Sequence, residues 1–361
     1  MTMKVKTLCA FALGAALLGI ALASEAAAEM SVPLKELVAE ANKEGALTLS
    51  WSSSTFGGTD GAQKFEAAMA KLWGAKIHID FVPGPDMARI GNQLATEFQA
   101  GQKAHADIFL GAAPQITPLL KLDFFVSADW VSYLPERIRP EFAEVNNSVV
   151  RVVTGLSGVT YNSQAAPMKP QTLEDFLRPE WKGRIASTPY AASLEVLSAD
   201  DVWGAQRALD YVRALSKQIS GLMRCGETER IATGEFLALV MDCTGQDALL
   251  WQAKGAPIAQ LLPLDVGEER YYYFAIPKNS PHIAAAKLFT VFMLSEEGQK
   301  LAWETWAIDL HSLPGSRTAS EIAQYEKAGG KSKEVTVEWW RRHPEIERDR
   351  QQLIKILAGK D

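Results

Sequence analysis

Residues 275–299 read AIPKNSPHIAAAKLFTVFMLSEEGQ, and this segment says most about the fold. It predicts a strand that ends at Pro277, followed by a helix with Ser280 as N-cap and Pro281 at the first position, where a missing N–H costs nothing. Apolar residues at helical spacing predict one face packed on a sheet, namely Ala285, Leu288, Phe289 and Phe292. A second helix is predicted after Ser295, because two glutamates follow where the helix dipole favours acidic groups. The segment is therefore a strand, helix, helix unit of an α/β protein.

The N-terminus predicts a cleavable secretory signal peptide, residues 1–28. Two lysines precede an apolar run without charge at 8–23, and alanines at 26–28 form a small-residue cleavage site. The run is too short to cross a bilayer, and no stop-transfer charges follow it. Cys9 lies inside the run and not at the cleavage point, which argues against a lipid anchor. We therefore expect export to the periplasm, with a mature chain that begins near Glu29.

Composition and length narrow the class of protein. A net charge of −6 gives the chain no electrostatic footprint for nucleic acid, so no nucleic-acid partner is expected. No stretch after the leader is apolar for long enough to span a membrane. The 361 residues exceed what one core usually holds, so two lobes are expected. One continuous doubly wound domain is the alternative.

Strands and helices alternate along the chain, which predicts an α/β fold with ligands at the carboxyl ends of its strands. The first set has strands at Ala46–Trp51, Ile77–Val82 and Ala106–Leu110, with helices at 31–44, from 60 and at 87–100. A second set starts after 149–154, with a strand at 236–242 and helices near 202–217 and 228–233. Strands at 258–264 and 271–276 then return the chain to the first set.

Four segments, in order, resemble periplasmic solute-binding proteins of ABC importers, in the group that carries iron, polyamines, thiamine and phosphonates. They are Ala106-Asp107-Ile108-Phe109, Gly158-Val159-Thr160-Tyr161-Asn162, Glu180-Trp181-Lys182-Gly183-Arg184-Ile185, and the opening segment with its Lys278-Asn279-Ser280-Pro281-His282 turn. The resemblance implies a type 2 periplasmic-binding fold, with two lobes of mixed sheet flanked by helices. It also implies two hinge crossings between the lobes and a cleft that closes on its ligand.

The resemblance also sets the expected boundaries of the lobes. The first lobe comprises 29–157 and 268–361, and the second lobe comprises 158–267. The charged stretch 316–361 is expected to be a C-terminal helical extension that packs on the first lobe. A surface that docks a permease is the alternative there, although nothing in the sequence favours it.

The loop Ser52–Thr59 is the first candidate for a ligand site. Its hydroxyl residues, with Ser53, Ser54 and Thr55 at the centre, and two glycines lie between a strand end and a helix start. Hydroxyls and free backbone N–H groups at such a point suit an anionic or polar oxygen. The alternative is an N-cap within a flexible loop.

The second lobe offers a facing loop, Ser187–Ser193, whose position matches the family's second ligand loop. Thr188 and Tyr190 are the candidates there, and a polar turn with one surface tyrosine is the alternative. Tyr161 at the first crossing is a further candidate, although a tyrosine that packs against the sheet explains it equally well. Asp242, at a strand end, would suit an amine or a metal.

Cys225 and Cys243 are the only cysteines after the apolar run. In an oxidising compartment such a pair suggests a disulfide, which the sequence alone leaves open. A thiolate metal site would need more ligands than the neighbourhood shows, so no metal and no cofactor are expected.

Tyr271-Tyr272-Tyr273 raises the alternative of ferric iron, because ferric-binding members of the resembled family hold the metal with adjacent tyrosines. In those proteins the tyrosines follow the strand that here ends at Asp242, where this chain has Cys243-Thr244-Gly245-Gln246 instead. Alternating aromatic residues on a return strand also pack well in a sheet. Ferric iron is therefore the second choice of cargo.

A secreted α/β enzyme is the competing class. The five histidines are scattered, and the chain has no HExxH, GxSxG, GxxxxGK[ST] or CxxC motif. We therefore expect a binding protein and not an enzyme. It would be a monomeric periplasmic receptor that captures a small polar or anionic solute and delivers it to the membrane permease of an ABC importer.

Overall fold

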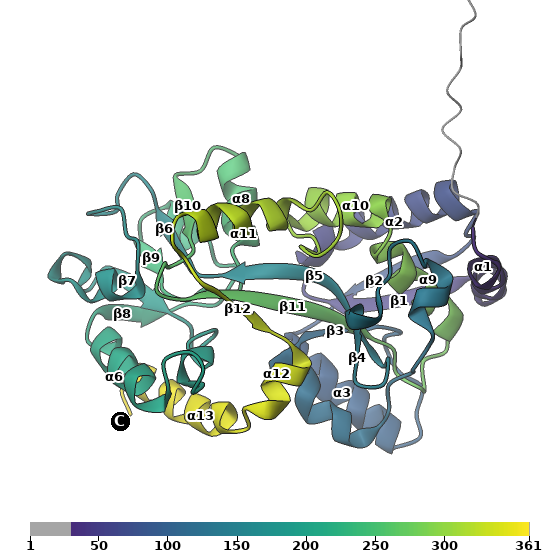
Figure 1. Ribbon diagram of the computed structural model, residues 1–361, viewed down its shortest axis with the longest axis horizontal. Helices are drawn as coiled ribbons and strands as arrows, with labels where there is room; N and C mark the ends of the chain where they lie inside the picture. Colours follow the sequence, from purple (N-terminus) through teal and green to yellow (C-terminus); the bar gives the residue numbers. More distant parts are fainter. Residues whose placement is uncertain (1–29, 361) are drawn as a thin grey trace, which may run out of the picture.

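The computed structural model describes residues 30–360, and the predicted signal peptide lies outside them. Figure 1 shows two lobes side by side, with two long strands running through the middle of the molecule, β5 (Val149–Ser157) and β11 (Gly267–Ala275). None of the helices within residues 30–360 combines the length and the apolar character needed to cross a membrane.

The first lobe has a five-stranded mixed sheet in which β5 and β11 are joined by β3 (Phe109–Ala112), β4 (Ala143–Glu144) and β12 (Ser332–Val335). Two further strands, β1 (Ala46–Trp51) and β2 (His78–Pro83), form a separate two-stranded sheet. β1 and β2 are parallel, and a parallel bridge from Leu49 to Ile108 links β1 to the residues just before β3. β11 is antiparallel to β3 and β5, and parallel to β12. The carboxyl ends of β1 and β3 therefore lie beside the strands that lead to the second lobe.

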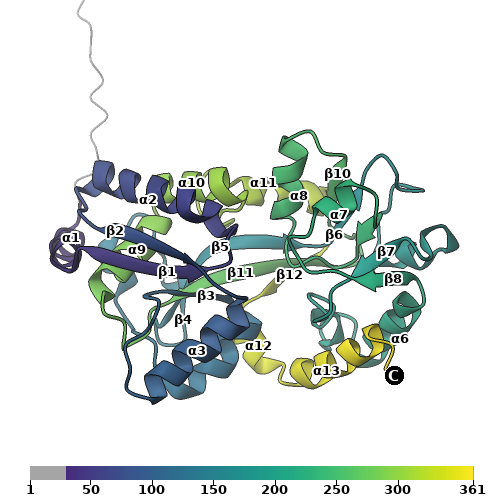
Figure 2. The same cartoon turned by 180° about the vertical axis from the view of Figure 1, so that it is seen from behind.

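Helices cover both faces of this sheet. They are α1 (Val32–Glu44), α2 (Gly58–Trp73), α3 (Met87–Gln99), α4 (Ala113–Ile116), α5 (Trp130–Tyr133), α9 (Ile283–Met293), α10 (Glu296–Trp306), α11 (Arg317–Lys327) and α12 (Val337–Arg342). Figure 2 shows α2, α10 and α11 on one side of the central strands, and α3 and α12 on the other. The helix start predicted at Ser295 is confirmed, since α10 begins at Glu296 and the Ser295 side chain caps it by accepting the N–H of Gly298 at 3.0 Å.

The second lobe has its own five-stranded mixed sheet in the order β10-β6-β9-β7-β8. The strands are β6 (Val159–Asn162), β7 (Ile185–Ser187), β8 (Ile219–Leu222), β9 (Ala238–Leu239) and β10 (Ile258–Leu261), and the helices are α6 (Ala205–Ser216), α7 (Glu229–Ala232), α8 (Gln246–Ala253) and α13 (Glu345–Leu357). β6 is antiparallel to β9 and β10, whereas β7 is parallel to β8 and β9.

The two lobes have separate hydrophobic cores, which confirms the predicted two-lobed α/β architecture. The first core gathers large aromatic side chains such as Phe65, Phe289 and Phe292 from several helices. The second core is smaller and contains Phe176 and Trp181. The chain leaves the first core along β5 and returns to it along β11.

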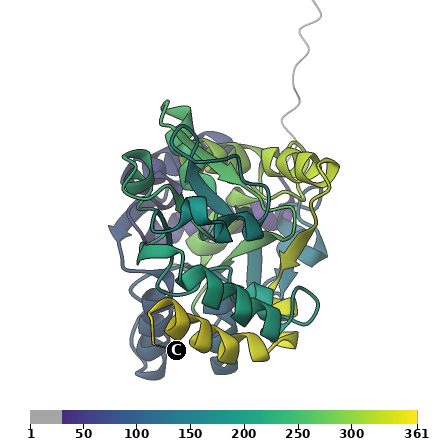
Figure 3. The same cartoon turned by 90° about the vertical axis from the view of Figure 1, so that its left-hand side faces the viewer.

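The C-terminal stretch differs from the expectation that all of 268–361 packs on the first lobe. Trp339 and Trp340 of α12 belong to the first core, but Leu353, Ile356 and Leu357 of α13 belong to the second. Figure 3, a side view, shows α13 lying beside α6. The chain thus passes between the cores a third time, between α12 and α13.

Two predicted boundaries are also shifted. The helix expected from Pro281 begins at Ile283, with His282 as its N-cap. Ser280 Oγ accepts the N–H of His282 at 3.1 Å and donates to Asp107 Oδ1 at 2.7 Å, and so lies just before the helix. The strand expected at 106–110 is β3, which starts at Phe109. Asp107 lies two residues before this strand, and its carboxylate accepts the N–H of Thr48 at 2.6 Å.

Candidate functional site

The first-lobe loop follows β1 and leaves two of its three candidate hydroxyls free to meet a ligand. Ser53 and Ser54 are exposed, whereas Thr55 is 1% exposed and its hydroxyl pairs with that of Ser52 at 2.6 Å. The loop is anchored by Phe56, whose ring lies 4.6 Å from that of Trp306, centroid to centroid. The packing of Phe56 on Trp306 therefore holds the loop that carries the two serines.

A glycine is required where this loop turns into α2. Gly58 has φ +61°, and a Cβ there would lie 2.4 Å from the carbonyl oxygen of Ser53. That distance is far below van der Waals contact, so a side chain at this position would displace the serine backbone. The close approach fixes the position of Ser53.

The second-lobe loop follows β7, and its threonine is already in use. Thr188 is fully buried, and its hydroxyl accepts the N–H of Ala192 at 2.8 Å. This bond closes the turn that carries Tyr190, which is half-buried. Thr188 therefore shapes the loop, while Tyr190 is the side chain of this pair that reaches other elements.

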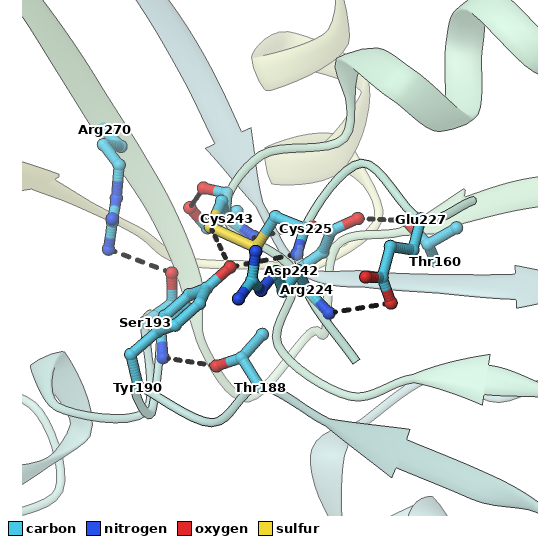
Figure 4. The surroundings of a disulfide bond; sticks show 12 residues. Thr160, Thr188, Tyr190, Ser193, Arg224, Cys225, Glu227, Asp242, Cys243 and Arg270 are labelled. Carbon is cyan, nitrogen blue, oxygen red and sulfur yellow. Dashed lines mark hydrogen bonds between the residues drawn. A yellow bond between two sulfur atoms is a disulfide. The ribbon is translucent and has the colours of Figure 1, made fainter. Parts of the chain in front are cut away.

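Tyr190 lies against a disulfide that joins Cys225 to Cys243, with the two Cα atoms 5.9 Å apart (Figure 4). The Tyr190 hydroxyl accepts the N–H of Cys225 at 2.9 Å and lies 3.9 Å from Cys243 Sγ. Burial raises the pKa of Tyr190, so the phenol keeps its proton at neutral pH. It can therefore still donate a hydrogen bond.

Asp242 precedes the second cysteine and is 3% exposed. Its carboxylate accepts the Thr160 hydroxyl at 2.7 Å and the N–H of Cys243 at 2.7 Å (Figure 4). Burial raises its pKa to about 7, although these two bonds favour the charged form, and the nearby carboxyl of Asp247 raises it further. Both oxygens are thus engaged within the protein, and the charge of the group changes near neutral pH.

Tyr161 does not join this group. It lies on β6, is 9% exposed and belongs to the second hydrophobic core. Its neighbours in the sheet are Ala238 and Ala259, whose small side chains leave room for the ring. The structure thus places Tyr161 in the packing of the sheet.

An ionic group that the sequence reasoning missed lies beneath the second-lobe loop. Arg270 on β11 donates to Ser193 Oγ at 3.0 Å and to Glu268 Oε1 at 2.8 Å, and it lies 3.7 Å from Glu195. Burial is the largest cause that raises the pKa of Glu195, to about 7. The signal in the sequence was the run Glu268-Glu269-Arg270, since charged residues are rarely buried in a strand without partners.

The triple tyrosine of β11 is buried and spread over both faces of the strand. Tyr271 donates to Glu334 Oε2 at 3.1 Å and Tyr273 donates to Glu144 Oε1 at 2.7 Å, on the same face. Tyr272 points the other way and packs on Trp306. Because successive side chains of a strand alternate between faces, adjacent tyrosines here cannot turn together toward one ion.

Metal ligation by the cysteines is also excluded while they are bonded to each other. Donor atoms of Cys225, Asp242 and Cys243 lie within 4.8 Å of one another. The thiolate is the form of cysteine that binds metals, and a disulfide sulfur is not a thiolate. This cluster is therefore structural.

The sequence of the chain matches a known protein family. Residues 57–300 match the family model described as bacterial extracellular solute-binding protein. The chain belongs to this family.

Solved structures of similar proteins share the fold of this solute-binding protein. The periplasmic binding protein AfuA from Actinobacillus pleuropneumoniae, with fructose-6-phosphate bound, has a TM-score of 0.65 at 19% identity, over 88% of this chain and 98% of that one. AgtB from A. tumefaciens R10, in complex with agropinic acid, has a TM-score of 0.65 at 18% identity, over 87% and 99%. Apo ferric ion-binding protein A from Pasteurella haemolytica has a TM-score of 0.64 at 14% identity, over 88% and 98%.

A curated relative aligns with a smaller part of the chain. An uncharacterized protein of Haemophilus influenzae is 25% identical over 186 residues, which are 48% of this chain and 53% of that protein. The solute-binding protein thus spans about half the length of this curated relative.

The structure brings together part of the predicted site. Tyr190, Asp242 and the two cysteines form one bonded group in the second lobe, with Thr188 in the same loop. Within residues 30–360, no hydrogen bond or ion pair of the structure links Ser53 or Ser54 to that group. A hollow of about 680 Å³ is lined by first-lobe residues such as Leu34, Trp303 and Arg317, and by none of the predicted site residues. The candidate site therefore consists of two polar surfaces, one on each lobe.

Proposed function

We propose that this solute-binding protein captures a small polar or anionic solute between its lobes and delivers it to the membrane permease of an ABC importer. The observation that carries the proposal is the pair of lobes with separate cores, joined along β5 and β11. Such a construction permits closure by rotation at the connecting strands, provided that the ligand contacts both lobes.

Each lobe contributes a different kind of contact in this proposal. Ser53 and Ser54 supply hydroxyls from the first lobe, and Tyr190 supplies a phenolic hydroxyl from the second. Thr55, Thr188 and Asp242 hold the loops in place, because their polar atoms already have partners in the protein. Tyr161 supports the sheet behind them. Neutral hydroxyl donors suit the oxygens of a sugar, a carboxylate or a phosphate ester.

Two of the similar structures are described with acidic compounds, which is compatible with an anionic cargo. AfuA is described with fructose-6-phosphate and AgtB with agropinic acid, and both compounds carry acidic groups. Ferric iron remains the second choice. Burial raises the pKa of Tyr272 to about 12, which disfavours the phenolate that ferric iron requires.

The wider biology follows from the same proposal. The protein is exported to the periplasm through a signal peptide at residues 1–28, acts as a monomer and performs no catalysis. The sequence lacks the catalytic motifs named above, and its family is one of solute-binding proteins.

A thermal-shift panel tests the function. The purified protein is heated with sugar phosphates, phosphate, phosphonates, carboxylates, spermidine, thiamine and ferric citrate. A ligand present at a hundredfold its Kd stabilises the folded state by about 2.7 kcal/mol, which raises the melting temperature visibly. We expect a hit among the acidic compounds, recovered unchanged after incubation. Chemical turnover of a hit would contradict the proposal, and a hit with ferric iron alone would favour the second choice.

A further inference from the structure

Two glutamates face each other across neighbouring strands near the point where the lobes join. Glu269 on β11 and Glu334 on β12 are directly opposite in the parallel register. Like charges in such positions destabilise a sheet. Glu269 is only 5% exposed, and its Oε1 accepts the Ser332 hydroxyl. A cation bound between the two carboxylates would therefore relieve their repulsion.

A histidine from a third segment completes the cluster. His311 follows α10, and its Nε2 lies 3.6 Å from Glu269 Oε2. Its other ring nitrogen, Nδ1, makes a 3.0 Å hydrogen bond with Thr154 Oγ1 on β5. Metal-binding histidines are typically held in this way, with the second nitrogen bonded to a neighbour that fixes the ring. One donor atom each from Glu269, His311 and Glu334 lies within 4.8 Å of the others.

The basic side chains around the cluster are engaged elsewhere. Arg151 pairs with Glu144 at 2.7 Å and stacks over the ring of Tyr271 at 4.4 Å. Lys333, the neighbour of Glu334, pairs with Asp201. Within residues 30–360, the two glutamates thus have the imidazole of His311 beside them, while Arg151 and Lys333 pair with other carboxylates.

We propose that Glu269, His311 and Glu334 bind a divalent transition-metal ion, for which Zn²⁺ is the best-fitting probe. Zinc accepts imidazole and carboxylate ligands at about 2.0–2.2 Å in a tetrahedron, which places ligand atoms roughly 3.3–3.6 Å apart. The 3.6 Å between His311 and Glu269 fits that spacing. Glu334 is exposed, and its Oε2 accepts the Tyr271 hydroxyl at 3.1 Å, which leaves Oε1 to close the remaining distance, and a water fills the fourth position.

The choice of ion follows from the donor set. Mg²⁺ and Ca²⁺ bind oxygen ligands, whereas a histidine beside two carboxylates is typical of zinc, manganese or iron sites. The ion would join β11, β12 and the segment that carries His311, at the base of the C-terminal stretch that passes to the second lobe. It would be a resident ion and not the transported solute, so the proposal stands apart from the proposed function.

Calorimetry on the purified full-length protein, stripped with a chelator and dialysed, tests the site. Titration with ZnCl₂ is expected to show one ion per chain, and elemental analysis after gel filtration is expected to give the same ratio. Glu334→Gln and His311→Gln should each weaken zinc binding at least tenfold. Glu334 is exposed, so its variant folds and decides the matter even where the histidine variant does not.

A matched control comes from another histidine-glutamate pair in the first lobe. His78 Nδ1 lies 3.0 Å from Glu66, and His78→Gln should leave zinc affinity unchanged. The proposal is overturned when the wild type binds no zinc, or when Glu334→Gln and His311→Gln bind zinc as the wild type does. Equal affinity for Mg²⁺ and Zn²⁺ would contradict the role assigned to His311.

Discussion

The two hydroxyl-rich loops of this protein have similar sequence patterns, but their hydroxyls do different work. In the first-lobe loop, Ser53 and Ser54 are exposed. In the second-lobe loop, Thr188 is buried and its hydroxyl is consumed by the N–H of Ala192. A loop of this kind after a strand therefore offers donors to a ligand only where no other element covers it.

The cover over the second loop comes from distant parts of the chain. Arg350 of α13 donates to the carbonyl oxygen of Tyr190 at 3.4 Å, and Arg270 of β11 donates to Ser193. The disulfide holds the hydroxyl end of Tyr190. The first-lobe loop provides freely accessible hydroxyls. The second-lobe loop forms, with the disulfide and Asp242, a rigid platform of Tyr190, Cys225, Asp242 and Cys243, whose phenolic hydroxyl can still donate a hydrogen bond.

The largest expected effect is the loss of the platform's disulfide. Replacing Cys225 and Cys243 by alanine should lower the free energy of unfolding by about 3 kcal/mol, because the loop they close no longer restrains the unfolded chain. Urea denaturation measures the change. The wild type under a reducing agent should fall to the same stability, and the double variant should not respond to it. A wild type that is insensitive to reduction would contradict the pairing.

Removal of the buried hydroxyl should have the next largest effect. Thr188→Val leaves the N–H of Ala192 without its partner in a buried site, which costs about 1–3 kcal/mol. Thr59→Val, at the exposed last residue of the first-lobe loop, is the matched control and should change stability by less than about 0.5 kcal/mol. Equal effects of the two substitutions in thermal unfolding would remove the contrast between the loops.

The platform should also make stability depend on pH. The folded pKa of Asp242 is raised to about 7 from 3.8, so between these values the folded state holds a proton that the unfolded state releases. Stability therefore falls as pH rises from about 4 to about 7, by at most about 1.4 kcal/mol per pH unit for one group. Burial raises the pKa of Glu195 to about 7 and acts in the same direction.

Asp242→Asn isolates the contribution of that carboxyl. The melting temperature of the variant should fall less between pH 5 and pH 8 than that of the wild type. Identical slopes would show that Asp242 keeps an ordinary pKa in the folded protein.

The sequence predicts the architecture well, because that architecture depends on local patterns. Alternating strands and helices, the helix start at Ser295 and the need for two cores can each be read from composition and spacing. The position of α13 could not be read in this way, because an amphipathic helix shows that it needs a core but not which one. The helix predicted after Ser280 begins two residues late, at Ile283, and Ser280 Oγ bonds both to the N–H of His282 and to Asp107, which is remote in sequence.

The candidate site was harder to predict than the fold. The sequence identifies which residues carry hydroxyls, but burial by other segments decides which hydroxyls are free. Thr55 and Thr188 resemble Ser53 and Ser54 in sequence context and differ from them in exposure. The ionic group around Arg270 was missed because its partners Ser193 and Glu195 come from another part of the chain.

The smallest expected effect on stability belongs to the exposed serines. Ser53→Ala combined with Ser54→Ala should change the free energy of unfolding by less than about 0.5 kcal/mol, because both side chains are exposed and no hydrogen bond of their hydroxyls within residues 30–360 is lost. Urea denaturation provides the measurement. A loss above about 1 kcal/mol would assign the serines a structural role like that of Thr188.

The central claim, capture of a solute between the two lobes, is tested most directly by calorimetric affinities. The compound that stabilises the wild type most in the thermal-shift panel is titrated into three proteins, namely the wild type, the Ser53→Ala and Ser54→Ala double variant, and Tyr190→Phe. Each hydrogen bond is worth about 1 kcal/mol, so both variants should bind at least about fivefold more weakly. A solute whose affinity depends on one lobe alone, or on neither, would contradict capture between the lobes.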